Sequence, residues 1–235
     1  LEWVPIEGYT IPLVFGPDAL FYRPDRSGLA RLDLASGEIT LAAFEGHTTW
    51  ISDLAYNAAG TRLASAGEDG AVWLWDTASG QALGMVRLDV IPLRLAFVED
   101  SVIILDESGA LHTWRDGAIS SEAGDGAAYD LAARGTTLLI ARDAGIDVFE
   151  VDSAADTLTL RATLVPDSDL APVDSYRAVA IDPSGAYFAA SGTAEPDDTQ
   201  RAVVDLWDAE SGAFVERLDG HAYSGPPDLS FSADG

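Results

Sequence analysis

The chain has 235 residues, of which 39 are acidic and 13 are basic, so its formal charge is −26. All the basic residues are Arg, and neither Lys nor Cys occurs. These counts exclude a P-loop lysine, a Schiff-base lysine, a disulfide framework and cysteine-held metals, and the negative charge disfavours nucleic acids and anionic membranes as partners.

The predicted elements begin with a unit of short strands over residues 11–44. Turn residues at Pro17-Asp18 and Arg26-Ser27-Gly28 interrupt its apolar runs. Neither this unit nor the rest of the chain shows the 3.6-residue periodicity of a helix over about ten residues. The unit is therefore expected to consist of strands.

Residues 49–88 form the clearest unit. Asn57-Ala58-Ala59-Gly60 and Asp69-Gly70 are turn sequences, and the second is typical of a tight hairpin. The turns separate short apolar or alternating runs at 50–56, 62–66, 71–76 and 82–88. Four short strands joined by turns predict an antiparallel meander.

The same template extends to the end of the chain. It fits residues 92–122, 127–164 and 176–218, and the last of these has a longer second loop at 193–200. A sixth unit begins near Pro227, and its final residues, Ser232-Ala233-Asp234-Gly235, match the first turn of earlier units. The chain is therefore expected to stop after one strand of that unit.

Three sequence markers recur in phase, with a period of about 43 to 44 residues. They are the Ser-Gly pairs that begin at Ser36, Ser79 and Ser211, the pairs Gly46-His47 and Gly220-His221, and the pairs Trp75-Asp76 and Trp207-Asp208. Because the markers share one period, we interpret the chain as a row of structural repeats.

The motifs of the second unit resemble the WD40 repeat family. The motifs are Gly46-His47, Leu63-Ala64-Ser65-Ala66-Gly67-Glu68-Asp69-Gly70 and Val72-Trp73-Leu74-Trp75-Asp76. The resemblance covers nearly the whole chain, although only this unit carries the full signature. It implies an all-β, WD40-like β-propeller with four-stranded blades, in which residues 1–235 form a single domain of five complete blades and parts of another. It also implies a non-catalytic scaffold for protein–protein interaction.

The length predicts that the propeller is incomplete within this chain. The full protein is expected to have six or seven blades, completed by sequence beyond Gly235 or by another chain, because an open ring would expose sheet edges. By the family's pattern, Trp3-Val4-Pro5-Ile6 could supply the outer strand of the last blade. Pro5 would confine that strand to a sheet edge.

The resemblance also implies a buried hydrogen-bond network in the second unit, formed by His47, Ser65, Asp69 and Trp75. A neutral His can donate from one ring nitrogen and accept at the other, so it can link an Asp to a hydroxyl. The other units depart from this pattern, with Leu32, Ser108, Phe149 and Ala190 at network positions. Their networks are expected to be lost, which leaves apolar packing to hold those units.

The candidate partner contacts are an aromatic group and two acidic loops. Trp73 is expected to be exposed, because its place in the third strand is taken in other units by the varied residues Ala30, His112, Asp147 and Asp205. The acidic residues lie in two long loops before and within the fifth unit, where loops often carry binding residues. The expected partner contacts are Trp73, Asp167, Asp169, Tyr176, Asp197, Asp198 and Tyr223.

Patterns for catalysis or metal binding are missing from the sequence. There is no Gly-x-Ser-x-Gly elbow, His-Glu-x-x-His motif or phosphate-binding loop, and the acidic runs do not match a calcium loop. His112 has no second His to join it as a ligand. We therefore expect no catalytic residue, no metal and no cofactor. Two alternatives stay open: a structural accessory subunit of a larger complex, and a propeller enzyme with a site in the central channel.

The expected partners are proteins, with basic ones favoured by the charge, and no nucleic acid. No transmembrane segment is expected, because no run of about 18 apolar residues occurs. The lack of Lys and the abundance of Asp and Ala favour a bacterial protein, cytoplasmic or exported. The absence of Cys and a first residue other than Met favour export.

Overall fold

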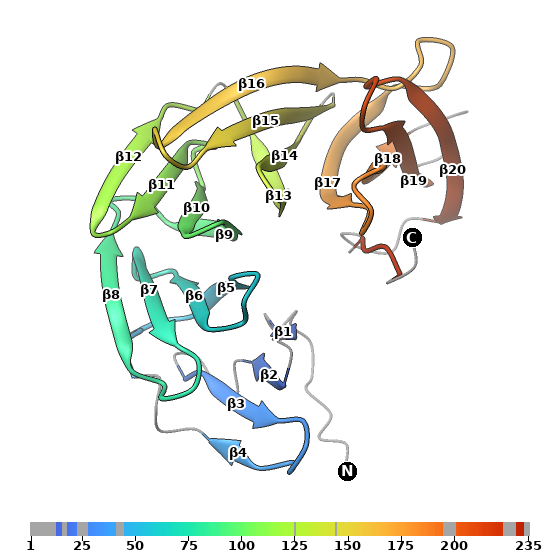
Figure 1. Cartoon of the computed structure of the whole chain (residues 1–235). Coiled ribbons are helices and arrows are strands. Elements are labelled where there is room, and N and C mark those ends of the chain that lie inside the picture. The colour runs from blue at the N-terminus through green and yellow to red at the C-terminus, as the bar shows by residue number, and fades with distance from the viewer. Residues whose placement is uncertain are drawn as a thin grey trace. The chain divides into compact units, whose positions relative to one another are not determined.

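Every regular element in the part of the chain that the structure describes is a β-strand. The computed structural model describes residues 13–15, 18–22, 28–40, 45–124, 126–143, 145–194, 201–222 and 229–232. The strands form five four-stranded sheets, and neighbouring strands in each sheet are consecutive in the chain (Figure 1). Their pairing is antiparallel, as in β1–β2 and β10–β11. The predicted all-β meanders are confirmed.

The first compact unit, Leu1–Leu93, contains two of the sheets. One consists of β1 (Leu13–Phe15), β2 (Ala19–Tyr22), β3 (Ala30–Asp33) and β4 (Ile39–Thr40). The other consists of β5 (Ile51–Tyr56), β6 (Arg62–Gly67), β7 (Ala71–Asp76) and β8 (Ala82–Arg87).

The second compact unit, Arg94–Gly235, contains the other three sheets. The first has β9 (Pro92–Val98), which begins just before the unit boundary, then β10 (Ser101–Asp106), β11 (Leu111–Arg115) and β12 (Ala118–Glu122). The next has β13 (Ala128–Arg134), β14 (Thr137–Arg142), β15 (Ile146–Asp152) and β16 (Thr157–Leu164). The last has β17 (Val173–Ile181), β18 (Tyr187–Ala194), β19 (Arg201–Asp208) and β20 (Phe214–Ala222).

A recurring Asp-x-x-Ser-Gly turn joins the third and fourth strands in three of the sheets. In each turn, one carboxylate oxygen of the Asp accepts hydrogen bonds from the amide and the hydroxyl of the Ser; the pairs are Asp33–Ser36, Asp76–Ser79 and Asp208–Ser211. The glycine that follows has a positive φ, 70° at Gly80, which a residue without a Cβ adopts readily. The Ser-Gly pairs that mark the sequence repeat therefore form the same hairpin turn in three sheets of this chain.

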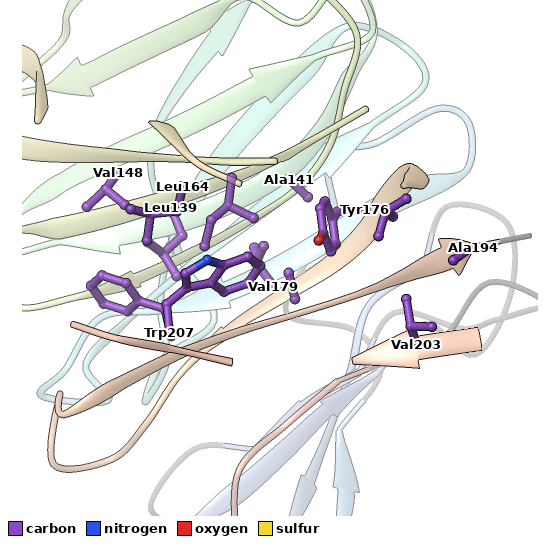
Figure 2. Close-up of a cluster of buried hydrophobic side chains, with 13 residues drawn as sticks. Leu139, Ala141, Val148, Leu164, Tyr176, Val179, Ala194, Val203 and Trp207 are labelled. Atoms are coloured by element: carbon purple, nitrogen blue, oxygen red, sulfur yellow. The ribbon is translucent and has the colours of Figure 1, made fainter. Parts of the chain in front are cut away.

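The sheets bury their apolar side chains in three clusters. One cluster lies in the first compact unit around Trp75, which is fully buried together with Phe21 and Leu63. The other two lie in the second unit, and the larger contains Trp207 and Tyr176 (Figure 2). Burial of large apolar side chains is the main stabilising contribution in such sheets, about 1.5–3 kcal/mol for each one fully buried.

Parts of the predicted organisation fall outside the described residues. Trp3-Val4-Pro5-Ile6 is among them, and only residues 229–232 of the predicted sixth unit are described, without a strand. That residues 1–235 form one propeller domain, completed by further sequence or by another chain, stays a prediction.

Candidate functional site

The buried polar network of the second sheet joins a loop, two strands and a turn. His47 Nε2 lies 2.8 Å from Ser65 Oγ on β6, and the indole N–H of Trp75 on β7 donates to the same oxygen at 2.9 Å. His47 Nδ1 lies 3.2 Å from Oδ1 of Asp69, whose other oxygen accepts the Thr48 amide at 2.8 Å. These contacts fasten the loop before β5 to the sheet.

The proton positions in this network follow from its electrostatics. Burial lowers the pKa of His47, and this effect outweighs the hydrogen bond to Asp69, which would raise the pKa, so the ring is kept neutral. Burial would raise the pKa of Asp69, but the Thr48 amide and His47 outweigh it and lower that pKa. Asp69 therefore accepts from Nδ1–H, and His47 accepts at Nε2 from the Ser65 hydroxyl. Every member of the chain of hydrogen bonds is then satisfied.

Gly67 is required by the same network. A Cβ at this position would lie 2.8 Å from Oδ1 of Asp69 and would also collide with the ring of His47. The glycine therefore makes room for the imidazole to reach the sheet.

Trp73 was expected to be exposed, because varied residues take its place on the third strand of the other sheets. That expectation is wrong: His112, Asp147 and Asp205 are buried, and Trp73 is half-buried. Trp73 stacks on Trp75 with ring centroids 5.2 Å apart. Four residues of this column face residues of the fourth strand, in the pairs Trp73–Met85, His112–Ser121, Asp147–Thr163 and Asp205–Arg217. The variety in the column reflects a different packing or polar network in each sheet rather than exposure.

The last sheet contains an ionic network in place of the lost serine network. Arg217 on β20 contacts both carboxylate oxygens of Asp205 at 2.7 Å, and its third nitrogen donates to the Ala171 carbonyl at 2.6 Å. The Tyr176 hydroxyl donates to Asp205. The carboxylate raises the pKa of Arg217, since it stabilises the charged guanidinium.

Tyr176 was expected to contact a partner, but the structure places it in the core. Its side chain is fully buried, and its ring packs edge-on against Trp207 with centroids 5.8 Å apart. Burial, followed by the hydrogen bond to Asp205, raises the pKa of its hydroxyl far above the usual value. The physical reason is that Tyr176 belongs to β17, which begins earlier than expected and turns this ring into the core.

The other two sheets of the second unit have networks of their own. On β15, Asp147 accepts hydrogen bonds from Arg142 and, at 2.6 Å, from the Thr163 hydroxyl. In the sheet β9–β12, His112 lies 2.8 Å from Asp106 and 2.7 Å from Ser121. These networks were not predicted from the sequence. The presence of His112, Asp147 and Asp205 at the same third-strand position of the repeat was the signal that could have indicated them.

The acidic loop between β16 and β17 is held at both ends by side chains of the last sheet. The indole N–H of Trp207 donates to the Val165 carbonyl at 3.2 Å, and Arg217 holds the Ala171 carbonyl. Within the loop, the Asp169 amide donates to Asp167 at 3.0 Å. Asp167 and Asp169 are exposed, as expected for partner contacts.

The remaining predicted contacts and sites can be placed as follows. Asp197, Asp198 and Tyr223 lie outside the described residues. Among the residues that the structure does describe, no group of three or more His, Asp or Glu side chains is arranged to hold a metal. A hollow of about 340 Å³ is bordered by β13, β17 and residues 229–231, and Arg134 is the ionisable residue in its wall.

No helix within the described ranges has the length and apolar character needed to cross a membrane.

Comparison with known proteins identifies one repeat and the fold. Residues 39–76 match the family model "WD40: WD domain, G-beta repeat". Vegetative incompatibility protein HET-E-1 of Podospora anserina is 30% identical over 87 residues, which make up 34% of this chain and only 6% of that protein.

Three solved structures share the fold at low identity. The β-propeller domain of Cps50 (Swd1) from Myceliophteria thermophila has a TM-score of 0.55 and 20% identity, over 92% of this chain and 87% of that one. A chain of the mitotic checkpoint complex has a TM-score of 0.69 and 17% identity, over 86% and 60%. U3-55K has a TM-score of 0.69 and 15% identity, over 91% and 66%. The sheets are thus β-propeller blades.

Proposed function

We propose that this chain, which carries a WD40 repeat and the fold of β-propeller blades, is a protein-recognition scaffold. The observation that carries the proposal is the acidic loop at residues 165–171, which presents exposed carboxylates on a backbone fixed at both ends. The role requires binding alone and no chemical step.

The fixed loop favours binding because little freedom remains to be lost. Ordering a flexible loop at an interface costs binding free energy, and a loop that is already held avoids part of that cost. Trp207 and Arg217 hold it through hydrogen bonds to Val165 and Ala171. A loop of this kind can therefore present its carboxylates in one geometry.

The chemistry of the loop indicates a basic partner with an apolar contact. Asp167 and Asp169 in the loop and Asp174 on β17 just after it are exposed, and the Val165 side chain at the start of the loop is 55% exposed. The formal charge of −26 would speed the encounter with a basic protein at low salt. Lys or Arg next to an apolar side chain would complement this surface.

The solved structures with this fold are consistent with such a role. One of them is a component of the mitotic checkpoint complex, a multi-protein assembly. We extend from it only the use of the blades as a surface for other proteins.

The test begins with recovery of the partner from native material using the natural full-length protein. Binding of the purified partner is then measured for the wild type and for the triple variant D167N/D169N/D174N. We expect the triple variant to bind at least tenfold more weakly and to have a shallower dependence on salt.

A matched control separates the loop from the overall charge. The variant E38Q/D89N/E210Q removes three exposed acidic groups elsewhere, so its net charge equals that of the loop variant. We expect it to retain nearly full affinity. Equal weakening by both triple variants would show that only the overall charge matters, and unchanged binding in both would contradict the proposal.

A further inference from the structure

A buried carboxylate, a buried imidazole and an exposed hydroxyl form a continuous hydrogen-bonded chain in the sheet β9–β12. Asp106 Oδ2, at the end of β10, lies 2.8 Å from Nε2 of His112 on β11. The other ring nitrogen, Nδ1, lies 2.7 Å from the hydroxyl oxygen of Ser121 on β12. The pairing of His112 directly opposite Ser121 in the sheet fixes this geometry.

The surroundings of Asp106 determine which atoms carry protons. The side chain of Asp106 is 2% exposed, and burial alone would raise its pKa. Hydrogen bonds from the Ser108 hydroxyl at 2.6 Å, from His112, and from the amides of Ser108 and Ala110 outweigh burial and lower the pKa. The ionised carboxylate can only accept, so Nε2 of His112 donates to it.

In the neutral form of the imidazole with its proton on Nε2, Nδ1 has a free electron pair to which the Ser121 hydroxyl donates. A carboxylate that holds an imidazole lets it act as a general base toward a serine, as in the Ser-His-Asp triad; here the two ring nitrogens are exchanged, with Nδ1 toward Ser121 and Nε2 toward Asp106. Such groups are recognised by their geometry and roles rather than by their order in the sequence.

Access separates this chain of groups from the similar one in the second sheet. Ser65 is completely buried, and its oxygen also accepts the indole N–H of Trp75. Ser121 is exposed, as is every residue of β12. A reagent in solution can therefore reach Ser121 but not Ser65.

We propose that Ser121 is an activated nucleophile that accepts an acyl or phosphonyl group from an activated ester or fluoride. The Ser121 oxygen forms the new bond to the carbonyl carbon or phosphorus while its proton passes to Nδ1 of His112. The bond to the leaving group breaks, and the leaving group departs with the electron pair. His112 is the general base, and Asp106 is a positioning residue that holds its ring. The site is separate from the proposed acidic contact loop.

The test uses an alkyl fluorophosphonate, which releases fluoride on reaction, and the full chain. Labelling is followed by intact mass and is located by peptide mapping. In the wild type we expect Ser121 to react at least 100-fold faster than Ser120, the exposed neighbour on the same strand, because general-base assistance contributes about 10²–10⁴-fold. This comparison is made within one folded molecule and needs no variant.

Variants then separate activation from exposure. S121A should abolish the label, and S120A should leave it unchanged. H112Q should slow labelling about 100-fold. D106N should also slow it, because it disturbs the position of the proton on the His112 ring, whereas D106E should recover part of the rate. Thermal unfolding confirms that each variant remains folded. If Ser121 in the folded wild type reacts no faster than Ser120, the proposal is overturned.

Discussion

Replacing Ser65 with Ala tests the network of the second sheet most directly. The substitution removes one oxygen atom from a fully buried position and leaves the strand otherwise unchanged. That oxygen serves two partners, since it accepts from the indole of Trp75 at 2.9 Å and lies 2.8 Å from His47. Nε2 of His47 and the indole N–H of Trp75 would each lose this hydrogen bond in a buried place.

The magnitude follows from the loss of these two buried hydrogen bonds. Leaving one buried polar group unsatisfied costs about 1–3 kcal/mol, so the free energy of unfolding of Ser65→Ala should fall by about 2–4 kcal/mol. Ser79→Ala is the matched comparison, because it also removes a hydroxyl that donates a short hydrogen bond, but at an exposed turn. That loss should be about 0.5–1 kcal/mol.

The assay is urea unfolding followed by tryptophan fluorescence, to which Trp50, Trp73 and Trp75 of the first unit contribute, together with Trp114 and Trp207 of the second. Both variants and the wild type are compared at the same pH and salt. Equal destabilisation by Ser65→Ala and Ser79→Ala would refute the reasoning, because it would mean that the Trp75 indole finds another acceptor, and Nε2 of His47 another donor, when the hydroxyl is removed.

Three further outcomes are expected. Gly67→Ala should lower the free energy of unfolding by about 1–3 kcal/mol, measured by urea unfolding, because the new Cβ meets the ring of His47. NMR titration should give His47 a pKa below the ordinary histidine value of 6.5. Since the unfolded chain then binds more protons, urea unfolding should show stability falling as the pH drops below 6.5. Arg217→Met should lower the free energy of unfolding by about 3–5 kcal/mol, because it leaves Asp205 as a buried charge without its cation, and hydrogen exchange should show faster opening at Ala171.

Much of the fold could be predicted from the sequence because its signals are local. The Asp-x-x-Ser-Gly turn is closed by hydrogen bonds between residues three apart, such as Asp76 and Ser79. Because such a turn depends only on nearby residues, it can be recognised in the sequence. Its recurrence predicted the repeat and, together with the other turns, the four-stranded meander. The family resemblance then indicated the network of His47, Ser65, Asp69 and Trp75, and these residues are joined by hydrogen bonds in the structure.

The burial of the third-strand residues and of Tyr176 on β17 could not be predicted in this way. Whether a strand residue faces the core depends on register, and a shift of one residue moves side chains to the opposite face. β17 has register shifts between Val173 and Ser175 and between Tyr176 and Ala178. Irregularities of this kind change the simple alternation of faces, and Tyr176 accordingly lies in the core.

The sequence by itself determined the repeat, the strands and the turns, because each depends on residues that are close together in the chain. Only the tertiary structure determined which residues the side chains of the third strand contact in each sheet. His112 meets Ser121 and Asp205 meets Arg217 across a strand pair whose register is set by the whole sheet. For that reason the sequence alone could not predict the hydrogen bond of the exposed Ser121 or the acidic loop that is held at both ends.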